Sequence, residues 1–209
     1  MDPSHQGPLG IQDTKLFANP LILSVYSETM RLRQAGFLNR TANIDDYHVN
    51  GWKFPKGDRV IASIWHEHRD KSVWNEGPVN GVHHPVDEFW GERFLVYPND
   101  PATGPRKPGT GTRARKDLKV EPNETGTEPV FTTEPMTGSF FPYGGGATIC
   151  PGRFFAKQEA LLGFALFISM FDIELDEKVK LQLDFSSYPF GVLRPKGKLP
   201  ARMRRRKAV

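Results

Sequence analysis

The feature that most constrains this chain is the stretch 141–156, which reads F-P-Y-G-G-G-A-T-I-C-P-G-R-F-F-A. It contains Cys150, the only cysteine among 209 residues, shortly after three consecutive glycines. Glycines allow positive φ angles and the close approach of another group. The apolar segment from Phe154 to Phe171 is predicted to be a helix, so Cys150 is expected in a loop just before a helix N-terminus.

A thiolate is stabilised at such a position, because unpaired N–H groups and the positive end of the helix dipole face the sulfur. The alternative is that Cys150 is a small buried apolar residue, which is the commoner role of a lone cysteine. The glycine run and the adjoining helix favour a shaped site around the thiol.

The composition narrows the classes of protein. A single cysteine cannot form an internal disulfide. No run of about 18 or more apolar residues occurs, so we expect no membrane span, and the polar start is not a signal peptide. Much of the net charge of +4 comes from residues 202–207, R-M-R-R-R-K. We interpret this run as a solvated terminus and expect no nucleic-acid partner, because no nucleic-acid-binding motif accompanies it.

The elements predicted along the chain are mainly helical, with small antiparallel β elements, an α+β class. Asn19-Pro20 is a typical helix start, and Asn50-Gly51 is a typical hairpin turn. The predicted segments are a helix over 15–36, a β meander over 41–63, an aromatic segment and long loop over 85–138, the cysteine loop and apolar helix over 139–172, short strands over 173–200 and a basic tail over 201–209.

Two histidine pairs, His66/His68 and His83/His84, are further candidates for a site. Neither pair has the i, i+4 spacing of metal ligands on a helix, and no cysteine lies nearby in sequence. We therefore interpret them as capping or packing histidines.

Three motifs, taken in order, resemble the C-terminal part of a cytochrome P450. The cysteine loop is similar to the family's haem-binding signature, and Glu28-Thr29-Met30-Arg31 is similar to its E-x-x-R motif. F-W-G-E-R-F-L, residues 89–95, is similar to the segment whose arginine, here Arg93, completes a Glu-Arg-Arg triad. The cysteine loop and L-V-Y-P-N-D-P are similar to those of fungal, sterol-hydroxylase-like members. The resemblance implies that residues 1–209 form one partial domain, the C-terminal portion of the P450 fold.

The resemblance implies a heme b bound through the thiolate of Cys150, the axial ligand of the iron. Gly144, Gly146 and Gly152 would let the loop wrap close to the porphyrin. Arg40 matches a position that pairs with a haem propionate, and a surface charge on a strand edge is the open alternative. Residues 186–193, especially Phe190 and Val192, fall where the family places a substrate-contacting turn, with ordinary core packing as the alternative.

Two positions of the loop depart from the family pattern. Tyr143 stands where phenylalanine is usual, and its additional hydroxyl needs a hydrogen-bonding partner. Thr148 stands where arginine or histidine is usual, which removes a cation from a propionate and leaves only a hydroxyl donor.

The implied function is that of a monooxygenase that inserts one oxygen atom from O2 into an apolar, sterol-like or secondary-metabolite substrate. Electrons would come from an NADPH–cytochrome P450 reductase-type donor. The expected location is the cytosolic face of the endoplasmic reticulum, or the cytoplasm without an anchor. The family's central oxygen-activating helix and N-terminal anchor have no counterpart in this sequence, so we expect no hydroxylation by the chain alone. The alternative is a non-catalytic remnant that binds haem weakly or not at all.

Overall fold

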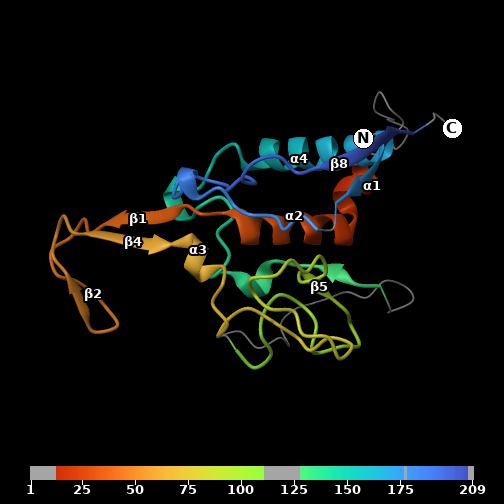
Figure 1. Ribbon diagram of the computed structural model, residues 1–209. Coiled ribbons are helices and arrows are strands. Elements are labelled where there is room, and N and C mark those ends of the chain that lie inside the picture. Colours follow the sequence, from red (N-terminus) through yellow and green to blue (C-terminus); the bar gives the residue numbers. More distant parts are fainter. Residues whose placement is uncertain (1–12, 111–127, 177, 207–209) are drawn as a thin grey trace.

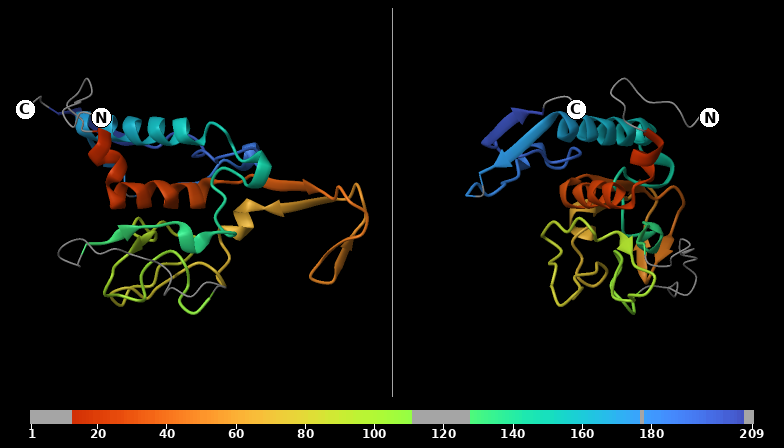
Figure 2. Two further views of the ribbon diagram at one scale, coloured as in Figure 1. Left: turned by 180° about the vertical axis from the view of Figure 1, so that it is seen from behind. Right: turned by 90° about the vertical axis from the view of Figure 1, so that its right-hand side faces the viewer.

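The computed structural model describes residues 13–110, 128–176 and 178–206. In it, α2 (Pro20–Arg33) lies between two layers. On one side lie α4 (Arg153–Met170) and the two-stranded sheet that follows it, and on the other lies an irregular layer formed by the chain after α3 (Ile64–Glu67) (Figures 1 and 2). The helix with the E-x-x-R motif is thus placed to contact both the irregular layer and the cysteine loop.

The helix predicted over 15–36 is shorter than its predicted bounds: α2 starts at Pro20, after Asn19 as the sequence indicates, and the residues before Asn19 form the separate helix α1 (Asp13–Ala18). Asn19 is extended, with φ −69° and ψ 117°, and its side chain accepts the Ile22 N–H at 3.0 Å. The residue before a proline is disfavoured in the helical conformation, so Pro20 both ends α1 and starts α2. The chain leaves α2 after Arg33 and enters a strand.

The strands of the β meander predicted over 41–63 form, but they do not pair in sequence order as a meander would. The strand β1 (Phe37–Thr41) pairs antiparallel with β4 (Arg59–Ser63), and β2 (Tyr47–Val49) pairs with β3 (Trp52–Phe54) as a separate hairpin. The hairpin turn itself forms as predicted, with positive φ at Asn50 and Gly51. Figure 1 shows this hairpin projecting beyond the far end of β1 and β4.

The irregular layer contains the main hydrophobic core of the described residues, built from Trp74, Val86, Phe94 and Met136. It includes β5 (Leu95–Val96), which pairs with β6 (Val130–Phe131), and the 3-10 turn η2 (Glu134–Met136). The end of the long loop predicted within 85–138 is therefore held by this strand pairing, and residues 111–127 of the loop lie outside the described residues. Edge-to-face aromatic contacts hold the core, such as Trp74–Phe94 with centroids 5.8 Å apart.

The last segment differs most from its prediction. Residues 201–205 of the predicted basic tail form β8 (Ala201–Arg205), which pairs antiparallel with β7 (Phe171–Leu175). Of the short strands predicted over 173–200, the first forms as part of β7, and the later ones are reduced to isolated bridges, Leu183–Pro195 and Val192–Gln34, near the 3-10 turn η4 (Phe185–Ser187).

Helix α4 is apolar on most sides, yet it is poorly covered by the rest of the described chain. Its buried residues are Leu161 and Ala165, whereas Phe154 and Phe155 are 66% and 71% exposed. No helix within the described ranges is long and apolar enough to cross a membrane.

Candidate functional site

The structure brings Glu28, Arg31 and Arg93 together in one buried ion cluster. Arg31 donates to both carboxylate oxygens of Glu28, from Nε at 2.7 Å and from Nη2 at 2.9 Å. Arg93 Nε donates to Glu28 Oε1 at 3.0 Å from the other side. All three side chains are fully buried. One carboxylate therefore pairs with two guanidinium groups. Arg93 is 65 residues from Glu28 and 62 residues from Arg31 in the sequence.

Backbone carbonyls satisfy the remaining donors of the two arginines. Arg31 donates to the carbonyls of His68 at 2.6 Å and Val86 at 2.7 Å. Arg93 donates to the carbonyls of four residues of the irregular layer, Asn75, His84, Pro85 and Glu88. Burial lowers the pKa of Arg93 from its ordinary value, and the Glu28 carboxylate opposes that change. The cluster thus fixes a layer with little regular structure against α2.

His68 links this cluster to the cysteine loop. Its Nε2 accepts the Phe141 N–H at 2.8 Å, and its Nδ1 lies 3.2 Å from the Arg31 carbonyl. These partners assign the proton to Nδ1. Burial, together with the charges of Arg31 and Arg69, lowers the pKa of His68 to about 3, so the ring is neutral at neutral pH. His68 is a buried packing residue, as predicted. Nothing in the sequence indicates that it also contacts the cysteine loop.

The cysteine loop turns tightly through the glycine run. Gly144 and Gly146 have φ angles of +78° and +62°, in the left-handed region that favours glycine. After the 3-10 turn η3 (Gly146–Thr148), the Cys150 N–H donates back to the Tyr143 carbonyl at 3.0 Å. The loop is therefore closed by its own main chain immediately before α4.

Cys150 lies at the surface as a free thiol, three residues before the first residue of α4. The N-cap of α4 is Gly152, which has no side chain to cap the first turn. A Cβ placed on Gly152 would be 3.9 Å from Cys150 Sγ, which is an ordinary contact. The chain itself therefore does not require glycine at this position, in contrast to Gly144 and Gly146.

Arg40 reaches the cysteine loop from β1, although it is more than 100 residues away in sequence. Its Nη2 donates to the Gly145 carbonyl at 2.5 Å, and its Nη1 lies 3.3 Å from Thr148 Oγ1. A Cβ on Gly146 would come within 2.9 Å of Arg40 Nη2. Arg40 is thus a strand residue whose guanidinium lies on the loop, beside Thr148.

These residues fit a haem. The exposed thiol can be an axial ligand, and the exposed phenylalanines of α4 can cover an apolar macrocycle. A planar guanidinium beside a hydroxyl suits a carboxylate such as a propionate. Within the described residues, no group of three His, Cys, Asp or Glu side chains is placed to hold a metal ion.

The hydroxyl of Tyr143 is expected to need a hydrogen-bonding partner, which the sequence does not identify. It is hydrogen-bonded to the hydroxyl of Tyr26 on α2, 117 residues earlier. Burial, followed by the hydrogen bond with Tyr26, raises the pKa of Tyr143 above its ordinary value. Only the unmatched hydroxyl of Tyr143 indicates such a contact in the sequence, and nothing there singles out Tyr26.

The turn over 186–193 docks beside the end of α2, where Leu193 N–H donates to the Arg33 carbonyl at 2.8 Å. Leu193 is buried, but Phe190 and Val192 are 85% and 50% exposed. Core packing within the described chain therefore does not account for these two side chains.

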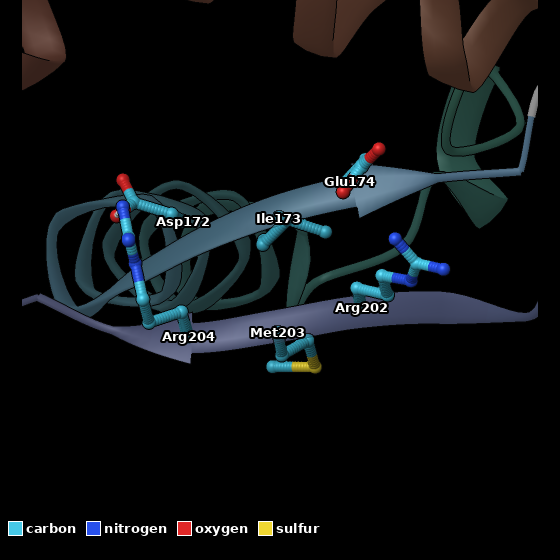
Figure 3. A pocket seen from close by; sticks show the side chains of 6 residues that line it. All are labelled: Asp172, Ile173, Glu174, Arg202, Met203 and Arg204. Atoms are coloured by element: carbon cyan, nitrogen blue, oxygen red, sulfur yellow. Dashed lines mark hydrogen bonds and ion pairs between the residues drawn. The ribbon is translucent and has the colours of Figure 1, made fainter.

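A separate hollow of about 370 Å³ lies on the β7–β8 sheet (Figure 3) and is lined by Asp172, Ile173, Glu174, Arg202, Met203 and Arg204. Asp172 is already paired with Arg204 at 3.1 Å and with Arg206 at 2.9 Å. This sheet begins at the end of α4 opposite Cys150, roughly 27 Å away for an 18-residue helix. The hollow is therefore not part of the thiol site.

The chain matches the cytochrome P450 family model over residues 10–88 and 132–201. Glu28, Arg31, Arg40 and Cys150 lie inside the matched residues. Arg93 lies outside them, yet the structure places it on Glu28.

Curated relatives are similar over most of this chain. It is 40% identical over 193 residues to a cytochrome P450 monooxygenase, efuG, of Hormonema carpetanum, which covers 92% of this chain and 32% of that protein. It is 38% identical over 210 residues to a cytochrome P450 monooxygenase, fsoE, of Humicola fuscoatra, covering 100% of this chain and 35% of that protein. The chain thus spans about a third of the length of these relatives.

Solved structures show the same fold. A cyanobacterial CYP120A1 with bound retinoic acid has a TM-score of 0.58 and 23% identity, over 93% of this chain and 34% of that one. The haem domain of a cytochrome P450DA mutant has a TM-score of 0.60 and 19% identity, over 99% and 36%. At these identities the likeness concerns the fold alone, a mixture of helices and small antiparallel strands.

Proposed function

Because this chain belongs to the cytochrome P450 family, we propose that it binds a heme b through the thiolate of Cys150, and that the whole protein is a haem monooxygenase. The observation that carries the proposal is the free, exposed thiol in a glycine-shaped loop at the start of α4, with the Arg40 guanidinium on the same loop. A thiolate with a neighbouring cation and apolar side chains matches the needs of an amphiphilic haem.

Each part of the site has a distinct role in the proposal. When bound, the haem activates O2 for insertion of one oxygen atom into the substrate, with electron density supplied by the thiolate. Gly144 and Gly146 would let the loop approach the macrocycle closely, and Arg40 with Thr148 would bind a propionate. The cluster of Glu28, Arg31 and Arg93 holds the irregular layer in place, at a distance from the chemistry.

The partners follow from the same assignment. The electron donor would be a reductase of the NADPH–cytochrome P450 type, which would dock beside Cys150, where Arg153 and Lys157 lie one turn apart on α4. The substrate would be an apolar, sterol-like or secondary-metabolite molecule, contacted by the exposed Phe190 and Val192. We propose the cytosolic face of the endoplasmic reticulum as its location.

A carbon monoxide spectrum of the haem-loaded, reduced chain tests the cofactor assignment. We expect the far-shifted Soret band that thiolate ligation produces, and we expect Cys150→Ala to lack it while still being folded by circular dichroism. A parent chain and a Cys150→Ala variant with identical spectra would contradict the assignment and favour the non-catalytic remnant.

A further inference from the structure

The contact between Tyr26 and Tyr143 joins two parts of the molecule that the main chain separates widely. Tyr26 lies on α2, two residues before Glu28 of the buried cluster, and Tyr143 lies in the cysteine loop. Both rings are half-buried, so each hydroxyl has limited access to water and depends on the other for a partner.

Tyr143 is also the residue that closes the loop. Its carbonyl accepts the Cys150 N–H at 3.0 Å, while its ring hydroxyl is bonded to α2. The glycine run lies between Tyr143 and Cys150, and glycine has the fewest steric restrictions on its backbone. Tyr143 therefore connects the thiol-bearing end of a pliable loop to a helix fixed by fully buried ion pairs.

The other side-chain ties of the loop act elsewhere. His68 holds the Phe141 N–H, at the entry to the loop. Arg40 holds the Gly145 carbonyl from a solvent-exposed position. Of these ties, the tyrosine pair is the one whose loop residue is hydrogen-bonded directly to Cys150.

We propose that the hydroxyl pair of Tyr26 and Tyr143 is a positioning contact, which ties the cysteine loop to α2 and holds Cys150 in the orientation needed for iron ligation. The role in iron ligation rests on the proposed haem function, whereas the contact between the two hydroxyls is present in the chain without haem. A phenylalanine at position 143 could pack in the same place, but it could not make this bond.

Phenylalanine variants distinguish positioning from general stability. Tyr26→Phe and Tyr143→Phe each leave one hydroxyl without its partner, whereas the double variant leaves two rings of nearly unchanged shape. If the bond positions the loop, all three variants loosen the loop at Cys150 to a similar extent. The effect of the double variant is then no larger than that of either single variant. Global stability should instead be lowest in the single variants and recover in the double variant.

Hydrogen exchange of the Cys150 amide, measured on the full chain without haem, reports how firmly Tyr143 holds this amide, because the amide donates to the Tyr143 carbonyl. We expect exchange about fivefold faster in all three variants, the factor that corresponds to loss of one hydrogen bond. The amides that pair β7 with β8 should be unchanged. Tyr47→Phe, which alters an exposed tyrosine of the β2–β3 hairpin, is the matched control and should leave Cys150 unchanged.

Three results would overturn the proposal: an unchanged Cys150 amide, equal acceleration in the β7–β8 sheet, or additive effects of the two substitutions. With haem bound, we also expect the thiolate-type carbon monoxide band to decay about fivefold faster in the three variants than in the parent. A parent chain without that band refutes the proposed function, whereas a band with the same lifetime in all four chains refutes the positioning role.

Discussion

Replacing Glu28 with glutamine removes the only carboxylate of the buried cluster. Glu28 accepts two bonds from Arg31, one from Arg93 at 3.0 Å and one from the Trp90 N–H at 3.2 Å. Glutamine keeps one acceptor oxygen, but its amide nitrogen would meet an Arg31 donor. Two guanidinium groups would then stay buried without a counter-charge, which costs roughly 3–5 kcal/mol.

That cost is large relative to the roughly 5–15 kcal/mol that holds a typical domain folded. Urea unfolding followed by tryptophan fluorescence is a suitable assay, because Trp74 is fully buried next to the cluster, with Arg31 Cζ 5.1 Å from its ring centre. We expect Glu28→Gln to lower the free energy of unfolding by about 3 kcal/mol or more, or to prevent folding.

Asp46→Asn is the matched control, since it removes a carboxylate from an exposed ion pair with Lys53. Its positive φ of 54° is also well tolerated by asparagine. We expect a change below about 1 kcal/mol for this variant. A Glu28→Gln variant that unfolds at the same urea concentration as the parent would refute the view that the cluster fixes the irregular layer.

Three further predictions concern the cysteine loop and its supports. His68 has a pKa of about 3 in the folded chain and about 6.5 unfolded, so the unfolded chain binds more protons between these values. Stability should therefore fall as pH drops through this window, by on the order of 5 kcal/mol in all, and His68→Gln should flatten that slope in urea titrations at several pH values. Gly146→Ala should lower the free energy of unfolding by about 1 kcal/mol, because its φ is +62°. By displacing Arg40 it should also weaken haem binding in a titration. The control Gly57→Ala, also at positive φ but with open space around it, should affect stability alone. Arg40→Ala should raise the haem dissociation constant roughly tenfold through the loss of a charge-assisted bond, and Arg59→Ala in the same sheet should not; equal effects of the two variants would leave Arg40 as an ordinary surface charge.

The sequence predicts best where a local pattern determines the structure. The start of α2 follows from Asn19-Pro20, and the position of Cys150 before a helix follows from the glycine run and the apolar segment behind it. The hairpin turn at Asn50-Gly51 follows from the conformational preferences of these two residues. In each of these cases, neighbouring residues alone decide the backbone.

The sequence predicts poorly where residues distant in the chain decide the structure. The strand β1 pairs with β4 across an intervening hairpin, and β8 forms from an arginine-rich segment because β7 offers an edge and Asp172 pairs with two of its arginines. A solvated tail and a paired strand have the same composition here, so composition cannot separate them.

The buried face of α2 shows the same limit for the site. It consists mostly of polar residues, including Ser24, Ser27, Glu28 and Arg31, so hydrophobic periodicity does not reveal which side of the helix is covered. The family resemblance supplies Glu28, Arg31 and Arg93, whereas His68 and Tyr26 emerge only from the structure. Their partners are 73 and 117 residues away in the sequence.

Iron-edge X-ray absorption of the haem-loaded chain tests the central claim, that Cys150 is the axial ligand, most directly. We expect one sulfur scatterer at bonding distance from the iron in the parent chain, and its loss in Cys150→Ala. Because Cys150 is the only cysteine of the chain, this comparison also separates its sulfur from those of the methionines. A first shell of nitrogen and oxygen alone in the parent, or a sulfur that persists in Cys150→Ala, would contradict the account.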